Sequence, residues 1–453
     1  MDRGLISVDR WEKGSQAYFL THLHADHTKG LSSTWSHAPL YCSSFTADLI
    51  PLKFPHFDLS LLHVFHIGTW QTLNLISRSS GAPTAVEFIA IDACHCPGSV
   101  MLLFRGEFGC MLYTGDFRWE EGCRMAAKAK EMLLGAIKDD KVEVVYLDNT
   151  YCNPIYDFPS RQVAAKQIID IIASHPEHDV IIGINTLGKE DLLVQISEAL
   201  KIKIWVWPER MWTMDLLGIS DNFTIKTTIT RVRAVPQYSF SVETLEELNK
   251  IKCPTIGIMP SGLPWVKKSP PKTKCISRAV LTANCKKAEW SEDDGDGDGE
   301  EYEPAGGIGP PEKLHKYIFT VPYSDHSNFA EIRDFIKLIR PTNLKGIVSS
   351  SSCYIEPMYY LGLLCQGNRP SEVVNSKLKR KASATAAGSN KKPSGSYIAE
   401  LVRRRSMTLK ARLSRIRLSK HSILRKVRRG ATIQDNEIAD LKTDSDSDGN
   451  QVP

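Results

Sequence analysis

The sequence predicts a mixed α/β fold: two α/β domains followed by a basic tail. Short apolar runs, such as 17–20 and 142–147, have the length and composition of buried strands, and polar residues follow each of them. Apolar residues at helical spacing over 163–174 and 329–339 predict helices between such strands. After residue 370 the composition becomes polar and basic, which marks the end of the folded part.

Length and composition limit the class of protein. A chain of 453 residues suggests two or three domains, and 42% hydrophobic residues is ordinary for a globular core. The 11 cysteines form no CxxC pair, so we predict neither a disulfide framework nor a zinc finger, in keeping with a reducing compartment. No apolar run reaches the length of a transmembrane helix, and the N-terminus lacks the shape of a signal peptide. We therefore expect a soluble, intracellular protein with no membrane partner.

Charge is distributed unevenly along the chain, whose net charge is +5. Residues 377–429 contain eighteen Lys or Arg and one Glu, whereas 288–303 contain nine acids and no base, and 435–448 contain six acids and one Lys. Outside these segments the chain is close to neutral. The basic tail could bind a phosphate backbone or serve as a nuclear address. A solvated, disordered tail with neither role is the alternative.

The densest group of candidate ligands follows the apolar run 17–20, in the sequence Thr-His-Leu-His-Ala-Asp-His. His22 and His24 are two residues apart, so an extended chain points both to the same side. Asp26 and His27 come after the chain turns and can serve a second ion. Imidazole and carboxylate are the groups that Zn²⁺ binds in catalytic sites, and two neighbouring ions can hold the attacking and leaving oxygens of a displacement. The alternative is a polar loop whose histidines are satisfied by hydrogen bonds.

The same placement, a polar residue directly after an apolar run, recurs along the chain at Asp9, His95, Asp116 and Asp148. Polar groups collected at one edge of a sheet would form an open site on a rigid scaffold. Cys94 and Cys96 flank His95 and raise the alternative of a soft-metal site. Because other cysteines are distant in the sequence, we predict that both are reduced core residues.

Together these residues resemble the metallo-β-lactamase superfamily, in which HxHxDH is followed by an isolated His and an isolated Asp. The resemblance is closer to its nucleic-acid-processing branch, the β-CASP nucleases, which add a strand-end acid, matched by Asp148, and a late His, matched by His326. Val348 matches a position that tends to be Val in DNA-processing members and His in RNA-processing members. Three further segments are similar to the DNA cross-link repair group, and most similar to its 5′ exonucleases: 30–35, 39–42 and 113–118.

This resemblance implies an αββα metallo-β-lactamase sandwich with an inserted α/β β-CASP cap. It assigns the first part of the sandwich to 1–154, the cap to 155–312 with an acidic disordered loop over 288–311, the closing part to 313–370, and a mostly disordered tail to 371–453. A strand over 317–321 would belong to the closing part and lead to His326. Residues 40–80 contain several aromatics and the histidines His56, His63 and His66, whose spacing forms no clear metal pattern, and we interpret them as core or surface residues.

The resemblance also implies roles for the residues. One zinc ion would be held by His22, His24 and His95, a second by Asp26, His27 and His326, with Asp116 between them. Asp9 and Asp148 would orient imidazoles, so the predicted catalytic residues are Asp26, His27, Asp116, Asp9 and Asp148. A zinc-activated water would attack the phosphodiester phosphorus. Either one or two ions would bind, and Mg²⁺ or Mn²⁺ are alternatives to zinc.

A candidate phosphate site follows the predicted strand 180–184. Gly188 and Lys189 precede a helix, whose free N–H groups and dipole attract anions. An ordinary helix start is the alternative. Ser261, after a strand over 255–258, could line the same cleft.

The function that these features imply is a zinc-dependent 5′-to-3′ DNA exonuclease that prefers 5′-phosphate ends, on single strands or at duplex ends. It would act in the nucleus in interstrand cross-link or double-strand break repair, or in chromosome-end (telomere) processing. The tail would bind repair or chromosome-end proteins, and 377–381 with 391–392 resemble a two-part nuclear localisation signal. The alternatives are a structure-selective DNA endonuclease, an RNA-processing nuclease and a non-catalytic DNA-binding scaffold.

Overall fold

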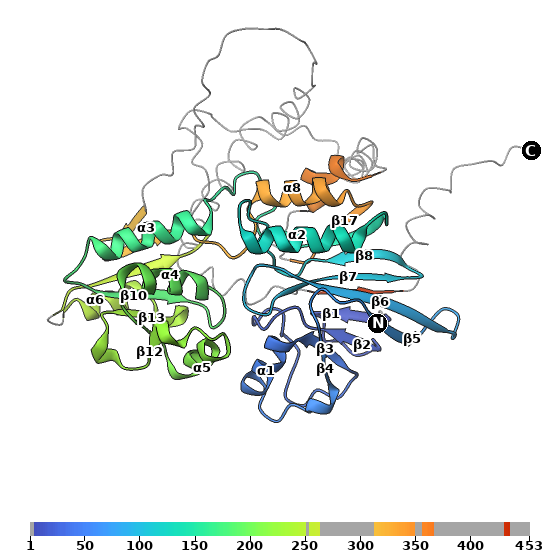
Figure 1. Ribbon diagram of the computed structural model, residues 1–453, viewed down its shortest axis with the longest axis horizontal. Coiled ribbons are helices and arrows are strands. Elements are labelled where there is room, and N and C mark those ends of the chain that lie inside the picture. Colours follow the sequence, from blue (N-terminus) through green and yellow to red (C-terminus); the bar gives the residue numbers. More distant parts are fainter. Residues whose placement is uncertain (1–3, 251–252, 263–311, 349–355, 367–429, 435–453) are drawn as a thin grey trace, which may run out of the picture.

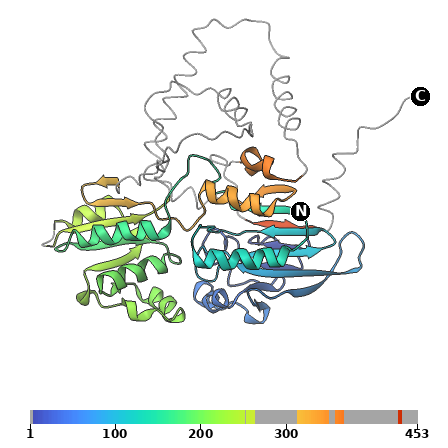
Figure 2. The ribbon, with the colours of Figure 1, turned by 45° about the horizontal axis from the view of Figure 1, so that its top comes forward.

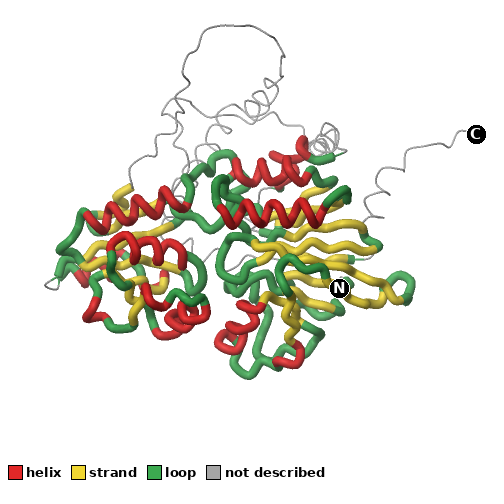
Figure 3. Tube along the Cα trace, viewed as in Figure 1, coloured by secondary structure: helices red, strands yellow, loops and turns green. Residues whose placement is uncertain are grey.

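The computed structural model describes residues 4–250, 253–262, 312–348, 356–366 and 430–434. These residues form two α/β bodies that lie side by side, each built on its own sheets (Figures 1 and 2). The first body contains a five-stranded and a six-stranded sheet, and the second body contains a seven-stranded sheet. Both bodies contain helices as well as strands (Figure 3). The predicted mixed α/β class is therefore confirmed.

The two sheets of the first body differ in strand direction. The five-stranded sheet has the order β18-β1-β2-β3-β4, and its strands are parallel except for β18. The six-stranded sheet has the order β17-β9-β8-β7-β6-β5, with antiparallel pairing from β5 to β8 and parallel pairing from β8 to β17. The strand bounds are β1 Ile6–Val8, β2 Ala17–Phe19, β3 Leu40–Ser43, β4 Leu62–Phe65, β5 Gln71–Ile76, β6 Pro83–Asp92, β7 Val100–Gly106, β8 Gly109–Tyr113, β9 Val142–Leu147, β17 Asn343–Gly346 and β18 Ala431–Ile433.

The first body has four layers, with the two sheets face to face between helices (Figure 1). Aromatic rings fill the space between the sheets, where Phe19 packs against Phe88 and Phe104. The outer face of the six-stranded sheet is covered by α2 (Arg124–Ile137), α8 (Phe329–Ile339) and α9 (Pro357–Leu361). The outer face of the five-stranded sheet is covered by α1 (Ser44–Lys53). Short 3₁₀ turns lie at Leu59–Leu61 and Gly362–Leu364.

Local sequence explains where the helices of the first body begin and end. The Ser43 side chain caps α1 by accepting a hydrogen bond from the Thr46 amide. At α8, Asn328 and Glu331 form a reciprocal capping box, and the helix ends at Arg340 in a left-handed conformation. Its buried residues recur at helical spacing and face the six-stranded sheet: Ile332, Phe335, Ile336 and Ile339.

The second body is a largely parallel sheet with the order β12-β11-β13-β10-β14-β16-β15, in which only β15 is antiparallel. One face packs against α3 and α4, and Phe240 and Leu245 cover the other. The strands are β10 Asp179–Ile184, β11 Ile204–Trp205, β12 Phe223–Thr224, β13 Val232–Pro236, β14 Thr255–Pro260, β15 Glu312–His315 and β16 Ile318–Val321. The helices are α3 Arg161–Ala173, α4 Glu190–Leu200, α5 Pro208–Leu216 and α6 Val242–Leu248, with 3₁₀ turns at Ser220–Asn222, Thr227–Ile229 and Gln237–Ser239.

Strand pairing changes one expected boundary. We placed the strand over 317–321 in the closing part of the sandwich, beginning at 313. The strand exists as β16, but it pairs in parallel with β14, with Gly257 opposite Ile318, and so belongs to the second body. The chain returns to the first body after Val321. An apolar run predicts a strand, but it does not say which sheet the strand joins.

A second difference concerns the tail, which we expected to be mostly disordered. Its residues Ala431–Ile433 form β18 and pair with the edge strand β1, drawn in red in Figure 1. Gly430 precedes this strand at φ +114°, and a Cβ there would lie 2.6 Å from the Asp9 carbonyl oxygen. The remainder of the tail and the acidic loop 288–311 lie outside the described residues. Residues 40–80 also form β3, α1, β4 and β5, which were not predicted.

Candidate metal centre

The predicted ligands come together at one end of the two sheets of the first body. His22, His24 and His27 follow β2, His95 follows β6 and Asp116 follows β8. Their possible ligand atoms form overlapping groups, within which all atoms lie within 4.8 Å of one another. The groups are His22, His24, His95 and Cys96; His22, His27 and Asp116; and His95, Asp116 and His326.

Ring nitrogens and one carboxylate face each other across this centre. His24 Nδ1 lies 3.0 Å from His22 Nε2 and 3.1 Å from His95 Nε2. Asp116 Oδ1 lies 3.2 Å from His27 Nε2, and its Oδ2 lies 3.7 Å from both His22 Nε2 and His95 Nε2. His326 Nε2 is 3.9 Å from Asp116 Oδ2.

Buried Asp9 fixes the orientation of two of these imidazoles. His27 Nδ1 donates to Asp9 Oδ2 at 2.7 Å, and the Thr21 hydroxyl donates to the same oxygen at 2.7 Å. Because the Thr21 hydrogen is used in this bond, its Oγ1 accepts from His22 Nδ1 at 3.0 Å. The Nδ1 proton of each imidazole is therefore engaged, which leaves both Nε2 atoms unprotonated in the neutral ring.

Asp148 performs the same role for His326. His326 Nδ1 donates to Asp148 Oδ2 at 2.7 Å. Burial opposes ionisation of this carboxyl, but His326 and the Thr150 hydroxyl and amide outweigh it and hold the pKa of Asp148 below its usual value. The ionised carboxylate keeps the proton of His326 on Nδ1 and directs its Nε2 toward the centre.

Main-chain carbonyls hold the remaining two imidazoles. His24 Nε2 donates to the Leu187 carbonyl at 2.9 Å, and His95 Nδ1 donates to the Asp325 carbonyl at 2.8 Å. A carbonyl only accepts, so His24 Nδ1 and His95 Nε2 are the unprotonated atoms. Burial lowers the pKa of His24 to about 4 and that of His95 well below its usual value, so both rings are neutral.

The hydrogen bonds therefore define a convergent set of lone pairs. Four imidazoles place Nε2 within 3.9 Å of an Asp116 oxygen, whereas His24 Nδ1 faces the Nε2 atoms of His22 and His95. The buried Nε2 of His27 has no hydrogen-bond partner among the described residues. Lone pairs facing a carboxylate repel one another unless a cation lies between them. Neutral imidazole and carboxylate are the donors that divalent transition metals bind, so the centre fits one or two such ions.

Comparison with known proteins agrees with this geometry. A family model described as "DNA repair metallo-beta-lactamase" matches residues 218–352. The chain is 34% identical to 5′ exonuclease Apollo of Danio rerio over 373 residues, which cover 82% of this chain and 54% of that protein. It is 31% identical to DNA cross-link repair protein SNM1 of Arabidopsis thaliana, with 75% of this chain and 62% of that protein covered. It is 30% identical to Protein artemis of Mus musculus, with 75% and 46% covered.

The chain is similar to the DNA cross-link repair group of metallo-β-lactamase proteins. The resemblance read from the sequence is thereby confirmed. The chain spans about half to two thirds of the length of these curated relatives, with 54% of Apollo and 62% of SNM1 covered.

Asp26 is the predicted ligand that lies outside the three ligand groups. It is half-buried. It lies close enough to raise the pKa of His24 and of Lys53, in each case against the larger effect of burial. Lys53 donates to the Leu23 carbonyl and so supports the loop on which these residues lie. A direct role of Asp26 at a metal ion remains a proposal.

The predicted phosphate residues lie beside the centre, but they are already engaged. Lys189 Nζ contacts Asp325 Oδ2 at 2.8 Å, and both side chains are largely buried. The Gly188 amide donates to Glu190 Oε1 at 2.9 Å, and Glu190 in turn pairs with buried Arg210 at 2.6 Å. The start of α4 is therefore less open to an anion than the sequence suggested.

Two other predicted residues occupy defined positions. Ser261 is half-buried at the end of β14, and its amide donates to the Val321 carbonyl. The adjacent Gly262 is close to the Tyr151 hydroxyl and to Ser324, so Ser261 lies on the same side as the His326 loop. Val348 follows β17, where its backbone exchanges hydrogen bonds with the Asn149 side chain.

Sequence reasoning missed several residues that hold the ligands in place. Buried Arg118 donates to the carbonyls of Ser324 and His326 and pairs with Glu331 at 2.9 Å, which fixes the His326 loop. Thr21 and Asp325 are adjacent to predicted ligands, and this proximity was the available signal. The Leu187 carbonyl gave no signal, because any residue supplies one.

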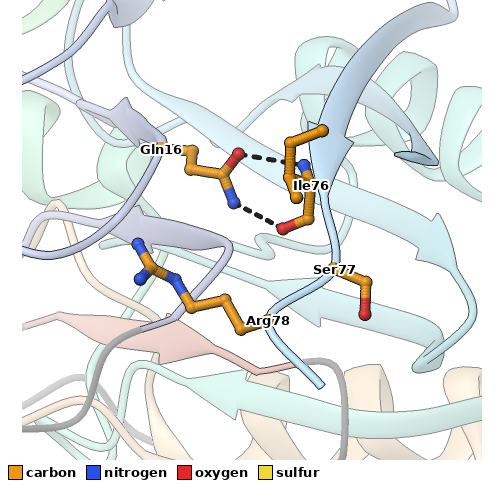
Figure 4. Close-up of a pocket in the computed structure, with 4 residues that line it drawn as sticks. All are labelled: Gln16, Ile76, Ser77 and Arg78. Carbon is orange, nitrogen blue, oxygen red and sulfur yellow. Dashed lines mark hydrogen bonds between the residues drawn. The ribbon is translucent and has the colours of Figure 1, made fainter. Parts of the chain in front are cut away.

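A separate hollow of about 500 Å³ lies between Gln16, Ile76, Ser77 and Arg78 (Figure 4). Gln16 precedes β2, whereas the histidine motif follows that strand. The Gln16 amide bonds both backbone groups of Ile76, and Arg78 donates to the Gly14 carbonyl. These bonds join the edges of the two sheets, and we assign the hollow no ligand. No helix in the described part of the chain has the length and apolar character needed to cross a membrane.

Proposed function

We propose that this protein is a metal-dependent nuclease, specifically a zinc-dependent 5′-to-3′ DNA exonuclease that prefers 5′-phosphate ends. The observation that carries the proposal is the convergence of five imidazoles and Asp116 on one centre, in which His24 is held by the Leu187 carbonyl of the second body. The relatives named 5′ exonuclease, DNA cross-link repair protein and artemis support DNA as the substrate.

The residues of the chain would perform the chemistry in distinct roles. His22, His24 and His95 would hold one ion, and His27 and His326, with Asp26, would hold another, with Asp116 between them. A bound divalent ion supplies a Lewis acid and lowers the pKa of water toward neutrality. Asp9 and Asp148 keep the protons of His27 and His326 on Nδ1 and so maintain their donor atoms during turnover.

Preference for a 5′ phosphate would depend on the loop between β10 and α4. Lys189 lies at the start of α4, and its partner Asp325 directly precedes His326. A terminal phosphate that reached Lys189 would compete with Asp325 for the positive charge of the lysine. The 5′ end of the DNA would then lie beside the metal centre. Ser261 would line the same path. The second body would then act as a cap that positions DNA over the ions.

The biological setting is also a proposal. Relatives in cross-link repair support a nuclear role in repair of interstrand cross-links or double-strand breaks, or in chromosome-end processing. The basic segment 377–429 would contribute the nuclear address and bind DNA or repair proteins.

The direct test is digestion of 3′-labelled single-stranded DNA that carries either a 5′ phosphate or a 5′ hydroxyl, beside a circular control. We expect a ladder of products from the phosphorylated linear DNA and none from the circle. Cleavage of the circle would instead support a structure-selective endonuclease, which the match to artemis favours as the second candidate. RNA of the same sequence tests the RNA-processing alternative. Absence of activity in a metal-loaded protein on all substrates would favour the non-catalytic scaffold.

Lys189→Ala tests the phosphate preference within the same assay. Lys201→Ala is a matched control, because Lys201 is exposed and caps the other end of α4 with the same left-handed backbone. A hydrogen bond to a charged group contributes about 1.5–3 kcal/mol, so the ratio of rates on phosphate and hydroxyl ends should fall by about tenfold or more. An unchanged ratio in Lys189→Ala would contradict this assignment. The ratio of rates on phosphate and hydroxyl ends is measured within each variant, so a general loss of activity lowers both rates and leaves the ratio unchanged.

A further inference from the structure

The loop 185–189 of the second body reaches the metal centre through one residue. The Leu187 carbonyl accepts a hydrogen bond from His24 Nε2 at 2.9 Å. The Leu187 side chain is 5% exposed and packs in an apolar cluster whose other members, among them Leu20 and Leu23, belong to the first body. Leu187 therefore connects the second body directly to a predicted metal ligand.

The backbone around Leu187 needs support from outside the loop. Thr186, Leu187 and Gly188 lie between β10 and α4, so the regular hydrogen bonds of a sheet or a helix do not fix their carbonyls. Gly188 has φ +97° and Lys189 has φ +67°, and a left-handed backbone is unfavourable for a residue with a Cβ such as Lys189. Buried carbonyls in such a loop depend on partners from other elements.

Arg210, in the first turn of α5, supplies these partners. Its Nη1 donates to the Thr186 carbonyl, and its Nη2 donates to the Gly188 carbonyl at 2.7 Å. Its charge is balanced by Glu190 Oε1 at 2.6 Å, and the same oxygen accepts from the Gly188 amide at 2.9 Å. Arg210 is 1% exposed, so water does not compete for these bonds. One guanidinium therefore fixes the residues before and after Leu187.

Arginine is the residue type that this arrangement requires. A guanidinium is planar and carries its N–H donors in a fixed fork, so it can bond both carbonyls and the Glu190 carboxylate at once. A lysine would keep a positive charge for Glu190, but its ammonium is a point charge without the fork that reaches both carbonyls. Arg210→Lys therefore separates the hydrogen bonds to the loop from the charge.

We propose that Arg210 is a positioning residue of the metal centre. It holds Leu187 so that the Leu187 carbonyl keeps the proton of His24 on Nε2 and leaves Nδ1 for the ion. Among the described residues Arg210 bonds no predicted metal ligand directly, so it acts through Leu187 and His24. The second body would thus set part of the metal affinity of the first body. This inference rests on the metal centre of the proposed function, but it does not depend on the choice of DNA substrate.

The test is the zinc affinity of Arg210→Lys, measured on the chelator-treated full-length protein by competition with a fluorescent zinc chelator. Direct partners of metal-bound histidines contribute about 10–100-fold to affinity, and Arg210 acts one contact further away, so we expect a loss of about three- to tenfold. A merely structural role would lower the stability of the second body without this loss.

Arg231→Lys is the matched control for stability. Arg231 also joins two elements of the second body through main-chain carbonyls, but these precede β10, at the end of that strand away from loop 185–189: Ile172, His175 and His178. Both variants should unfold at lower urea concentration than the wild-type protein, whereas only Arg210→Lys should lose zinc affinity. Equal zinc affinities in the two variants would overturn the proposal.

A double-mutant cycle shows whether Arg210 acts through His24. His24→Ala removes the imidazole that Leu187 bonds, so adding Arg210→Lys to it should have no further effect on zinc affinity. A further loss as large as that of Arg210→Lys alone would overturn the proposed route. Absence of zinc binding in the wild-type protein would overturn the metal centre and this inference together, whereas zinc binding without coupling would overturn this inference alone.

A measurement on the unmodified protein covers the case in which Arg210→Lys fails to fold. Because coupling is reciprocal, zinc bound at the centre should stabilise the start of α5. Hydrogen exchange can be followed by mass spectrometry at the Arg210 and Met211 amides, both of which bond the Trp207 carbonyl. The turn at 175–178, which Arg231 supports, is the internal control. We expect zinc to slow exchange at the start of α5 more than in this turn, and equal effects would overturn the proposal.

Discussion

The metal centre has two halves that are supported in different ways. In the carboxylate-held half, Asp9 and Asp148 fix His27 and His326 through hydrogen bonds of 2.7 Å. In the carbonyl-held half, His24 and His95 bond to main-chain carbonyls at 2.9 and 2.8 Å. A carboxylate strengthens an imidazole as a donor more than a neutral carbonyl does, because the bond is charge-assisted.

The supports also come from different parts of the chain. Asp9 and Asp148 follow β1 and β9 within the first body, and Asp116 follows β8. The Leu187 carbonyl lies between β10 and α4 of the second body, and Asp325 lies where the chain returns from it. One half can therefore form within the first body alone, whereas the other half requires the second body to be in place. A change in the position of the second body would thus affect the ion through His24.

Asp116 belongs to both halves, and its replacement should have the largest effect. Asp116→Asn removes the carboxylate that lies within 3.9 Å of the Nε2 atoms of four histidines, so we expect nuclease activity to fall to background and bound metal to decrease. The control is Asp92→Asn, which changes a half-buried carboxyl at the end of β6 that bonds the Cys94 amide. Wild-type activity in Asp116→Asn, measured with equal metal loading, would contradict the assignment of the centre.

Asp9→Asn turns a carboxylate-held imidazole into one held by a neutral oxygen. Partners of metal-bound histidines typically contribute about 10–100-fold to affinity or activity, and we expect a loss in this range. Competition with a fluorescent zinc chelator measures the affinity. Exposed Asp139 supplies the control variant Asp139→Asn. If Asp9→Asn and Asp139→Asn bind zinc equally, the distinction between the two halves fails.

Gly188→Ala tests the carbonyl-held half. A backbone carbonyl cannot be removed by shortening a side chain, so the variant instead alters the backbone next to Leu187, whose carbonyl bonds His24. Gly188 has φ +97°, and a Cβ there would lie 3.4 Å from Asp325 Oδ2. A left-handed backbone costs a residue with a Cβ about 1–2 kcal/mol, so the loop should shift and zinc affinity should fall by at most about thirtyfold. Gly218→Ala is the control, because Gly218 also has positive φ but no atom near the added Cβ. Equal zinc affinities in the two variants would show that the Leu187 carbonyl does not control His24.

Gly430→Val should have the smallest effect on activity and a clear effect on the edge of the five-stranded sheet. The added Cβ would meet the Asp9 carbonyl oxygen at 2.6 Å, so β18 should detach from β1. We expect the free energy of unfolding to fall by about 1–3 kcal/mol, with faster amide exchange in β1. Gly81→Val controls for the left-handed backbone, because Gly81 has open space around it. Equal exchange rates in β1 in the two variants would contradict the role of β18.

The sequence predicted the strands that deliver the ligands because their apolar runs are long enough to recognise. The sequence alone predicted that these side chains lie together at one edge of a sheet, because the motif around His22 and three further residues each follow a strand: His95, Asp116 and Asp148. The sequence could not show that Leu187 holds His24, because that contact joins residues far apart in the chain through a backbone atom. It also could not assign β16 to the seven-stranded sheet or β18 to the five-stranded sheet, since the sequence of a short strand does not indicate which strand it pairs with.

Asp26 and Cys96 illustrate the remaining limit. Residue type and spacing favoured Asp26 as a ligand and Cys96 as a core thiol. The folded loop places Cys96 in a ligand group and leaves Asp26 outside all three, because the turns after His24 and His95 decide which side chains face inward. Such turns depend on packing against other elements, which the local sequence does not specify.

The most direct test of the account is anomalous diffraction at the zinc edge from crystals of the protein grown with Zn²⁺. The account predicts a strong peak among His22, His24 and His95, with Asp116 between this position and any second peak near His27 and His326. The peaks should disappear in crystals of Asp116→Asn or become much weaker. Fully ordered imidazoles with no anomalous peak between them in the wild-type protein would contradict the central claim that these residues form a metal centre.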